Sequence, residues 1–314
     1  MSPRPVVALA GGVGAARFLS GLVQVVPPQD ISVIVNTGDD RDFFGLRVCP
    51  DLDIITYTLA GCVRSDTGWG LAGDTFDCLG ALRRLRSDTW FQLGDQDLAT
   101  HIHRSARLRE GASLVEVTRE IAAAFDVDVE LLPMTEALAP TRLLRRDAEP
   151  SDFEEYLVRD GAPDDIEEVD LSTAGSAAPA PGVLPAIDAA RALLICPSNP
   201  VVSIGTIRAV RGVEKQLRAR RDAVAVSPII GGKPVKGPAD RLMRAVGAEV
   251  SALGVAKLYQ PIVSGIVIDR ADAQLGSAIE ALGLRVRTGE TLMQNARISR
   301  ELAALALELA MEAR

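Results

Sequence analysis

The stretch Pro5-Val-Val-Ala-Leu-Ala-Gly-Gly-Val-Gly-Ala-Ala-Arg17 decides the fold of this chain. It opens with a short apolar run that is typical of a buried strand, and a glycine-rich turn follows at once. Residues 15–26 then carry apolar side chains at helical spacing, Pro27-Pro28 ends them, and residues 31–35 form a second apolar run. Strand, glycine turn, helix and strand in this order predict the start of a parallel, doubly wound sheet.

The same alternation returns in the last third of the chain. The pattern predicts strands at 192–196, 223–226, 265–268 and 284–287 and helices at 207–221, 238–246 and 298–313. The residues between the two regions follow a mostly helical period, and short strands or a hairpin are expected at 153–158 and 166–171.

We therefore predict an α/β fold, in which a Rossmann-like, doubly wound, mostly parallel sheet carries a largely helical insertion. Residues 1–53 and 172–314 are expected to form the core. Residues 54–171 are expected to form the insertion, which would cover the site as a lid. Core and insertion are expected to make a single intertwined unit.

Composition excludes several classes of function. The 314 residues include 34 Lys+Arg and 42 Asp+Glu, for a net charge of −8, so the chain lacks the basic surface of sequence-independent nucleic-acid binding. The four lysines all lie at position 215 or later, which excludes a Walker-type phosphate loop from the N-terminal half. The two histidines, His101 and His103, are too few for a three-histidine zinc site.

The cysteines indicate a reducing compartment. The four cysteines, at positions 49, 62, 78 and 196, form no C-x-x-C pair. No signal peptide is recognisable before the first strand, and no apolar run approaches the ~20 residues of a membrane helix. We therefore expect a cytoplasmic protein with reduced thiols and no membrane partner.

The glycine turn is a candidate phosphate site. Gly11, Gly12, Gly14 and Ala15 lie between a strand and a helix, where free N–H groups and the positive end of the helix dipole attract anions. The dinucleotide fingerprint is not met, because Arg17 takes the place of its third glycine. The simpler interpretation is a tight turn that needs glycine. Arg17 either adds a donor for a phosphate or faces solvent.

Four aspartates lie at or near predicted strand ends. Asp39 and Asp40 follow the second strand, and Asp51 and Asp53 come soon after them. Grouped carboxylates repel one another unless a cation lies between them, and Mg²⁺ takes such oxygen ligands beside substrate phosphates. We therefore predict a metal and phosphate site. The alternative is a simple turn followed by a helix N-cap.

The segment Gly94-Asp-Gln-Asp-Leu-Ala-Thr-His-Ile-His-Arg104 holds both histidines and two more aspartates. As a helix it places Asp97, His101 and Arg104 on one face, with Asp95 at its start. The two histidines face different sides of such a helix, so the pair does not suit metal chelation. We expect a ligand-binding role for this segment.

Two polar loops follow later strands. Ser198 and Asn199 can read a base edge or cap the next helix. Lys233 and Lys236 lie in a loop rich in glycine and proline, where their charges suit phosphates or simply face water.

Taken together, these motifs resemble the 2-phospho-L-lactate transferase family, the enzymes that build the deazaflavin coenzyme F-420. The resemblance runs in order over nearly the whole chain, through GGVGAARFLSGL, VNTGDD, CPDLDIITYTLAG, GWGLAGDTF, LGDQDLATHIHR, LREGASL, LPMTE, CPSNPVVSIG and SPIIGGKPVKGPA. The family's Rossmann-like core with a helical insertion agrees with the pattern described above.

Two other classes fit less well. A nucleotide-sugar-binding regulatory protein of the gluconeogenesis-factor-like family shares the glycine loop, but it resembles this chain much less at DLDIITYTLAG and LGDQDLATHIHR. A nicotinamide dehydrogenase would carry an acidic residue at the end of the second strand, and Asn36 stands in roughly that place.

The resemblance implies a transfer reaction. A guanylylated three-carbon phospho-acid donates its phospho-acid group to the terminal ribityl hydroxyl of the deazaflavin precursor Fo, and GMP leaves. Mg²⁺ is implied as the cofactor, because aspartates beside a donor of roughly three negative charges need a divalent cation between them. A homodimer and functional coupling to a guanylyltransferase are implied as well. The three-carbon acid stays open among phospholactate, phosphoenolpyruvate and phosphoglycerate derivatives. The arginine-rich, lysine-poor composition indicates a GC-rich bacterial genome, and a bacterial source favours the donor derived from phosphoenolpyruvate.

The resemblance also implies a role for each candidate residue. The nucleotide and phosphates are expected on Gly11, Gly12, Gly14, Ala15, Ser198, Asn199, Lys233 and Lys236. The metal is expected on Asp39, Asp40 and Asp51. Fo is expected on Asp51, Asp53, Asp95, Asp97, His101 and Arg104. The candidates for a catalytic base are Asp51, Asp53 and Asp95, with no choice made among them.

Overall fold

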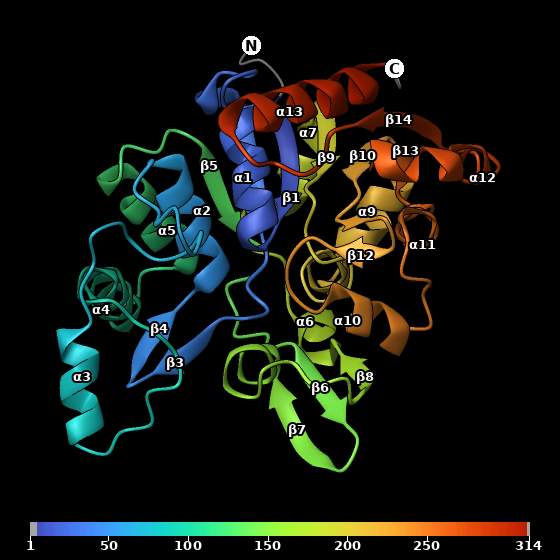
Figure 1. Cartoon of the computed structure of the whole chain (residues 1–314). Helices are drawn as coiled ribbons and strands as arrows, with labels where there is room; N and C mark the ends of the chain where they lie inside the picture. Colours follow the sequence, from blue (N-terminus) through green and yellow to red (C-terminus); the bar gives the residue numbers. More distant parts are fainter. Residues whose placement is uncertain (1–4, 313–314) are drawn as a thin grey trace.

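The computed structural model describes residues 5–312 of the chain. Its centre is a seven-stranded parallel sheet in the order β14-β13-β10-β9-β1-β2-β5 (Figure 1). The strands are β1 (Val6–Ala10), β2 (Ile31–Val35), β5 (Glu130–Pro133), β9 (Ala192–Ile195), β10 (Ala223–Val226), β13 (Val263–Asp269) and β14 (Arg285–Gly289). The α/β fold with a parallel, Rossmann-like sheet is confirmed.

The chain reverses its direction across the sheet at β1. From β1 it builds one half of the sheet through β2 and β5, and it later returns to β9 on the other side of β1. Leu9 therefore pairs with Ile34 of β2 and with Ile195 of β9. Ligands of doubly wound sheets bind beyond the carboxyl ends of the strands at such a point. The turns after β1 and β9 consequently border the expected ligand site.

The strand residues alternate between two apolar layers, one on each face of the sheet. Val7 and Leu9 belong to one layer, and Val6, Ala8 and Ala10 belong to the other. All five are buried, as expected for a parallel sheet that is covered on both faces.

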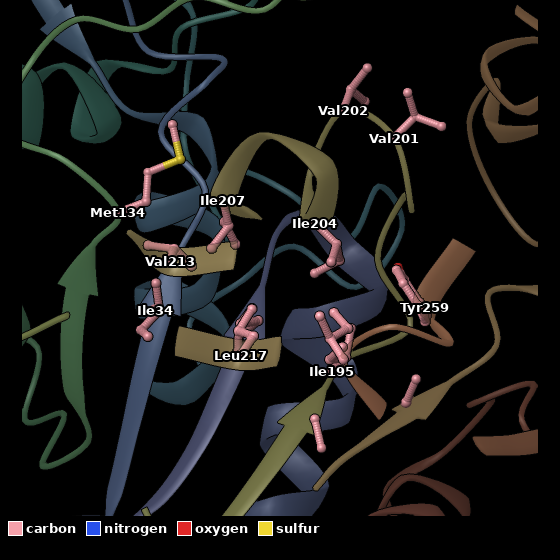
Figure 2. Packing of buried hydrophobic residues seen from close by; sticks show 14 of the residues in the cluster. Ile34, Met134, Ile195, Val201, Val202, Ile204, Ile207, Val213, Leu217 and Tyr259 are labelled. Carbon is pink, nitrogen blue, oxygen red and sulfur yellow. The ribbon is translucent and has the colours of Figure 1, made fainter. Parts of the chain in front are cut away.

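Short helices cover the face to which Leu9 points. They are α6 (Ser172–Ser176), α7 (Val183–Ala189), α8 (Ile204–Ala209), α9 (Val213–Arg220), α10 (Ala239–Ala245), α11 (Ala252–Tyr259) and α12 (Gly276–Glu280). Figure 2 shows Ile204, Ile207 and Leu217 in this layer together with Ile34 and Ile195 of the sheet.

Longer helices cover the opposite face. They are α1 (Gly12–Leu22), α2 (Pro50–Leu59), α5 (Leu114–Ala124) and α13 (Ala296–Met311). Within residues 5–312, no helix combines the length and the apolarity needed to cross a membrane.

The remaining elements lie outside the two layers. They are the hairpin β3 (Arg41–Phe43) and β4 (Leu46–Val48), the helices α3 (Asp77–Arg84) and α4 (Asp95–Arg109), the antiparallel sheet of β6 (Arg142–Arg145), β7 (Ala148–Asp152) and β8 (Ile166–Asp170), the hairpin β11 (Ile229–Ile230) and β12 (Lys233–Pro234), a π-helical turn at Glu155–Arg159, and 3-10 turns at Pro28–Asp30 and Arg270–Leu275. In Figure 1, α3, α4 and the β3–β4 hairpin lie on one side below the central sheet, and β6, β7 and β8 lie on the other.

Three details differ from the sequence prediction. The helix expected at 207–221 is divided into α8 and α9, because Gly212 between them adopts a left-handed conformation with φ of 85°. Residues 153–158 contain the π-helical turn, and the strand of that region is β7, just before it. β5 lies within 54–171, yet it is an edge strand of the central sheet. The division into core and insertion stays a prediction. The range predicted for the insertion contains β5, which belongs to the central sheet.

The first and last helices pack with almost no space between their backbones. α1 and α13 lie side by side on one face of the sheet (Figure 1). A Cβ atom at Gly21 of α1 would overlap the backbone of Ser299 in α13. Glycine is therefore required at this position by close approach rather than by an unusual φ.

We expect Gly21→Ala to lower the free energy of unfolding by about 1–3 kcal/mol, because the two helices must separate to admit a methyl group. Chemical denaturation measures this effect. Gly80→Ala is the matched control, since Gly80 also lies in a helix and a Cβ there meets nothing within 4 Å. The control should be neutral or stabilising by up to about 1 kcal/mol. Equal stability of the two variants would contradict the close contact of α1 with α13.

Candidate functional site

A cavity of about 610 Å³ lies beyond the carboxyl ends of the central strands. The turns that follow β1, β2, β9, β10 and β14 contribute to its wall, as do α2, α4 and residues 153–158. The cavity is lined by the glycines Gly11, Gly12 and Gly14 and by polar side chains that include Arg17, Asp39, Asp51, Asp53, Tyr57, Asp97, His101, Glu154, Ser198, Asn199, Ser227, Lys236 and Thr291. Among the expected site residues, Ala15, Asp40, Asp95, Arg104 and Lys233 do not line it.

The glycine turn packs closely against two neighbouring segments. The backbone N–H of Gly11 donates to Ser198 Oγ at 3.0 Å, and that of Gly12 donates to Asp51 Oδ1 at 2.7 Å. A Cβ at Gly14 would lie 2.5 Å from the carbonyl oxygen of Pro197. The first two N–H groups are thus bonded to the protein itself, and the tight-turn interpretation accounts for them. The turn nevertheless lines the cavity, at the positive end of α1.

The helix α2 brings Asp51 and Asp53 to the cavity. Pro50 starts the helix, and both aspartates lie buried in its first turn. Neither of them caps its own helix, because the N-cap residue is Cys49 and it makes no side-chain cap. The alternative of a simple N-cap is therefore wrong for these residues. Asp51 instead accepts a hydrogen bond from the first turn of the neighbouring helix α1.

An acidic cluster forms where β2 ends beside α2. The side-chain amide of Asn36 donates to Asp39 Oδ2 at 3.1 Å and to Asp51 Oδ2 at 2.9 Å. Burial, followed by the charges of Asp51 and Glu154, raises the pKa of Asp39 well above its ordinary value. Burial raises the pKa of Asp51 to about 6, and burial together with Asp51 raises that of Glu154 to about 7. The charge of Arg41 opposes the shift at Glu154 but does not cancel it, so the cluster is short of positive charge.

One buried oxygen of this cluster is left without a hydrogen-bond donor. Asp39 Oδ1 is buried and has no hydrogen-bond partner. Carboxylates that are crowded, buried and short of donors are the oxygen ligands that Mg²⁺ prefers. Asp39, Asp51 and Glu154 could therefore hold the metal expected from the sequence.

Asp40 does not line the main cavity. Together with Asp39 and Glu154 it lines a much smaller cavity of about 10 Å³. Burial raises its pKa to about 8, and a hydrogen bond with Cys49 and the charge of Arg104 oppose the shift. The structure thus does not bring Asp40 to the main cavity, where a metal ligand was expected.

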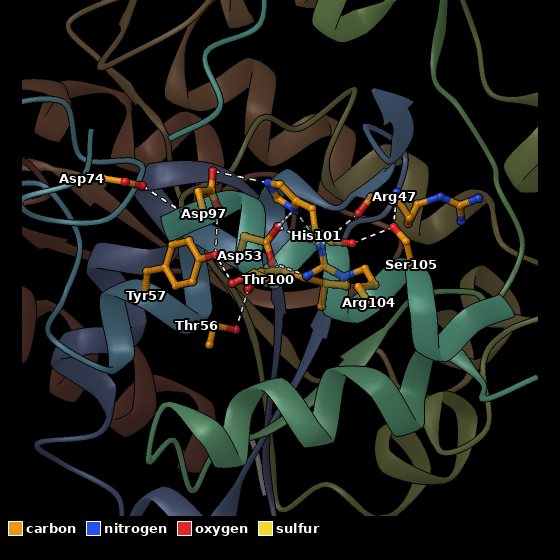
Figure 3. A network of polar contacts seen from close by, with 11 residues as sticks. Arg47, Asp53, Thr56, Tyr57, Asp74, Asp97, Thr100, His101, Arg104 and Ser105 are labelled. Carbon is orange, nitrogen blue, oxygen red and sulfur yellow. Dashed lines mark hydrogen bonds and ion pairs between the residues drawn. The ribbon is translucent and has the colours of Figure 1, made fainter. Parts of the chain in front are cut away.

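A second polar network occupies the wall made by α2 and α4 (Figure 3). Arg104 is only 1% exposed and forms a close ion pair with Asp53. Its Nη1 also lies 3.3 Å from His101 Nδ1. The hydroxyl of Tyr57 donates to Asp97 Oδ1 at 2.8 Å. The shared face of Asp97, His101 and Arg104 expected from helical spacing is confirmed.

This network does not suit a metal. Ligand atoms of Asp53, Asp97 and His101 lie within 4.8 Å of one another. The guanidinium of Arg104 already neutralises Asp53, so Asp97 is the one uncompensated carboxylate that this group offers to a divalent cation. Burial would lower the pKa of Arg104, but Asp53 outweighs it and the pKa is raised. Of the two acidic groups, only the one around Asp39 and Asp51 is short of positive charge.

Two cations face the cavity near the glycine turn. Arg17 lies on α1, and Lys236 lies on the loop after β12. Lys236 Nζ donates to the carbonyl oxygen of Thr67 at 3.0 Å. Burial, and then the charge of Arg17, lowers the pKa of Lys236. Lys233 is exposed on the β11–β12 hairpin and is not brought to this place.

The structure places Asp95 away from the cavity. Its carboxylate accepts hydrogen bonds from the backbone N–H groups of Asp77 and Cys78 and from the hydroxyl of Thr75. These donors lower its pKa, the hydroxyl of Thr75 most strongly. Asp95 therefore holds the first turn of α3, and its position does not support the catalytic and Fo-binding roles expected for it.

Ser198 and Asn199 both reach the cavity but are engaged by the protein. Ser198 accepts the N–H of Gly11, as described above, and Asn199 Oδ1 accepts the N–H groups of Val201 and Val202 at 2.9 and 3.2 Å. Asn199 thus folds its own loop and does not cap the next helix, because the N-cap residue of α8 is Ser203.

Sequence reasoning missed several lining residues, of which Tyr57 and Glu154 matter most for the chemistry. Tyr57 follows Asp53 by four positions on α2, so helical spacing could have placed it beside that aspartate. Glu154 belongs to a distant segment that was expected to be a strand, and no spacing in the sequence connects it with Asp51.

Comparisons with known proteins identify the family of the chain. The family described as 2-phospho-L-lactate transferase CofD matches residues 6–290. A phosphoenolpyruvate transferase from Kitasatospora aureofaciens is 44% identical over 316 residues and covers 98% of each chain. A 2-phospho-L-lactate transferase from Methanosarcina barkeri is 37% identical over 303 residues, which are 96% of this chain and 97% of that relative.

A solved structure extends the likeness of the fold. A UPF0052-family protein from Bacillus halodurans matches 98% of this chain and 99% of its own, with a TM-score of 0.60 and 15% identity. At this identity the likeness concerns the fold alone.

We expect the metal-free protein to lose stability as the pH rises from about 5.5 to about 8. The raised pKa values of Asp39, Asp40, Asp51 and Glu154 mean that the folded protein binds more protons than the unfolded chain in this window, so its stability falls with rising pH. Thermal unfolding in excess chelator at both pH values measures the change.

Asp39→Asn should reduce this pH dependence. Asp66→Asn is the control, because the pKa of Asp66 is lowered by Arg64 and lies outside the window. An Asp39→Asn protein with the pH dependence of the wild type would show that the cluster does not carry the effect.

Proposed function

The chain belongs to the 2-phospho-L-lactate transferase family, whose members are transferases of coenzyme F-420 biosynthesis, and we propose that its cavity transfers a phospho-three-carbon-acid group to the deazaflavin Fo. The donor would be the guanylylated phospho-acid, and GMP would leave. The observation that carries this proposal is the pairing, in one cavity, of a cation-deficient acidic cluster with a glycine turn at a helix N-terminus. Diphosphate chemistry needs both features.

The donor fits the side of the cavity that holds positive groups. The end of α1 and the side chains of Arg17 and Lys236 lie there and would receive the diphosphate. Lys236 would exchange the carbonyl of Thr67 for a phosphate oxygen. Binding here aligns the phosphorus with the acceptor, and alignment supplies much of the rate of phosphoryl transfer.

We propose Asp39 and Asp51 as ligands of Mg²⁺, with Glu154 in place of the expected Asp40. When bound, the ion would supply the positive charge that both the cluster and the diphosphate lack. The unbonded, buried Asp39 Oδ1 and the raised pKa values of the cluster support this assignment.

The acceptor fits the opposite wall. The ribityl chain of Fo is uncharged and rich in hydroxyl groups, which donate hydrogen bonds to carboxylates. Asp53, Asp97 and His101 line the cavity on that side. Arg104 lies behind them and does not line the cavity. It would therefore orient Asp53 and His101, which contact Fo, and would not contact Fo itself.

For the three-carbon acid we propose the phosphoenolpyruvate derivative. The relatives from Kitasatospora aureofaciens and Streptomyces griseus, at 44% and 42% identity, are named phosphoenolpyruvate transferases. The nucleotide-sugar-binding alternative gains no support, since no comparison favours it. We further propose a cytoplasmic homodimer that works with a guanylyltransferase.

Excess EDTA should abolish transfer, and added Mg²⁺ should restore it, because the acidic cluster repels the donor without a cation. Mg²⁺ should also raise the melting temperature of the wild type at about pH 8 but not that of Asp39→Asn.

We expect Asp51→Asn to lower turnover at least about tenfold in a folded protein. Full activity in excess EDTA would contradict the metal assignment.

A transfer assay read by mass spectrometry tests the substrate. The protein is incubated with Fo, Mg²⁺, GTP, a guanylyltransferase and one three-carbon phospho-acid in each tube. We expect a product of Fo and the phospho-acid with phosphoenolpyruvate. A product only with phospholactate would overturn the choice of donor. No product in any tube, together with no binding of Fo, would overturn the proposed function.

A further inference from the structure

The wall made by α2 and α4 contains a buried series of side chains that leads from Arg104 through His101 to Asp97 (Figure 3). The three residues recur on one face of α4. Arg104 and His101 are each 1% exposed, whereas the side chain of Asp97 is 14% exposed and reaches the cavity. The series therefore runs from the interior of the protein to the place where an acceptor would lie.

Arg104 favours one tautomer of His101. The Nδ1 atom of His101 lies 3.3 Å from Arg104 Nη1 and 3.6 Å from Asp53 Oδ2. A guanidinium only donates hydrogen bonds, so the closer contact favours the tautomer in which Nδ1 accepts. The proton of the neutral ring is then on Nε2. That nitrogen is buried, has no hydrogen-bond partner within residues 5–312, and lies 3.4 Å from Asp97 Oδ2. His101 thus presents an N–H group to Asp97.

Two neighbours hold Asp97 in its ionised form. Burial would raise its pKa, but the close contact with His101 and the hydrogen bond from Tyr57 outweigh burial, and the pKa is lowered. Tyr57 donates to Oδ1, and burial raises the pKa of Tyr57, so its hydroxyl stays protonated and available as a donor. At the other end, the N–H of Asp97 donates to Asp74 Oδ2 at 3.1 Å. The carboxylate is thereby fixed in orientation.

The other candidate bases are already engaged. Both oxygens of Asp51 accept hydrogen bonds, from Gly12 and from Asn36. Asp53 is paired with Arg104, and Asp95 lies outside the cavity. Within the described part of the chain, Asp97 Oδ2 accepts no hydrogen bond, and His101 Nε2 lies 3.4 Å from it. This oxygen is therefore free to accept a hydrogen bond from a hydroxyl group in the cavity.

We propose that Asp97 is the catalytic carboxylate that receives the attacking hydroxyl of the acceptor, and that Arg104 and His101 are positioning residues that orient it. This inference rests on the proposed transfer to Fo. The hydroxyl oxygen forms a bond to phosphorus, the bond from phosphorus to the GMP oxygen breaks, and GMP leaves with that electron pair. The hydroxyl proton passes to Asp97 Oδ2 and from there to water. A carboxylate of low basicity suffices, because a loose transition state removes this proton late.

Nuclear magnetic resonance of ¹⁵N-labelled histidine tests the relay without any substrate. The chain has only two histidines, so the His103→Gln variant assigns both rings. We expect a single tautomer of His101 with an unprotonated Nδ1 and a protonated Nε2. Arg104→Met should abolish this preference. A wild-type ring with its proton on Nδ1 would overturn the positioning role of Arg104.

Kinetics test the role of Asp97. We expect Asp97→Asn to lower kcat by about 100-fold or more, while the Kd of Fo, measured by its fluorescence, changes less than about threefold. His101→Gln carries its amide near Nε2, whereas His101→Asn carries it near Nδ1. The glutamine variant should therefore retain more of kcat than the asparagine variant. His103→Gln, an exposed position on the same helix, is the control and should equal the wild type.

The outcomes separate this inference from the proposed function. A wild-type enzyme that transfers to Fo, together with Asp97→Asn of equal kcat, would overturn the role of Asp97 and leave the proposed function in place. A wild type that does not transfer at all would overturn both. An asparagine variant at 101 more active than the glutamine variant would show that His101 only anchors Arg104.

Discussion

The arrangement of the site depends on the carboxylate of Asp51. It belongs to α2, yet it accepts the N–H of Gly12 in α1 and the side-chain amide of Asn36 at the end of β2. One side chain thereby joins the two first strand–helix connections of the sheet to the helix that begins the insertion. A buried anion is costly unless donors surround it, and the positive end of α1 helps to meet that cost. The position of this carboxylate also requires glycine at residue 11, because a Cβ atom there would lie only 2.7 Å from Asp51 Oδ2.

Aspartates on the two sides of the cavity differ in how their charge is balanced. Asp53 has Arg104 within the protein, so its wall is internally neutralised apart from Asp97. Asp39 and Asp51 have only the amide of Asn36 between them. Burial raises the pKa of both, and neighbouring carboxylates raise that of Asp39 further. The surroundings alone therefore decide whether an aspartate of this cavity has its charge balanced by the protein or left uncompensated. One wall suits uncharged hydroxyl groups, and the other suits a cation and the anion that accompanies it.

Local pattern was sufficient for much of the fold and for the location of the site. The run at 31–35 coincides with β2, because a continuous apolar stretch between turns has few other interpretations. β5 was not identified, since this strand of four residues begins with an exposed glutamate and follows a helix without a clear turn signal. The carboxyl ends of parallel strands meet, which is why Asp39 and Asp51 could be predicted to lie together. Glu154 could not, because its proximity arises only from tertiary packing. The burial of Arg104 was equally inaccessible, since arginine is usually exposed.

The packing of α1 against α13 determines when the molecule can fold during synthesis. β1 lies in the middle of the sheet and emerges first, but its neighbour β9 and the helix that covers α1 belong to the last 125 residues or so of the chain. Phe18 and Leu22, which are fully buried in the finished molecule, have no complete cover until residues 296–311 have left the ribosome. Contacts between such distant segments form slowly. The apolar face of α1 therefore lacks its native cover until residues 296–311 have been made, and chaperones protect exposed surfaces of this kind.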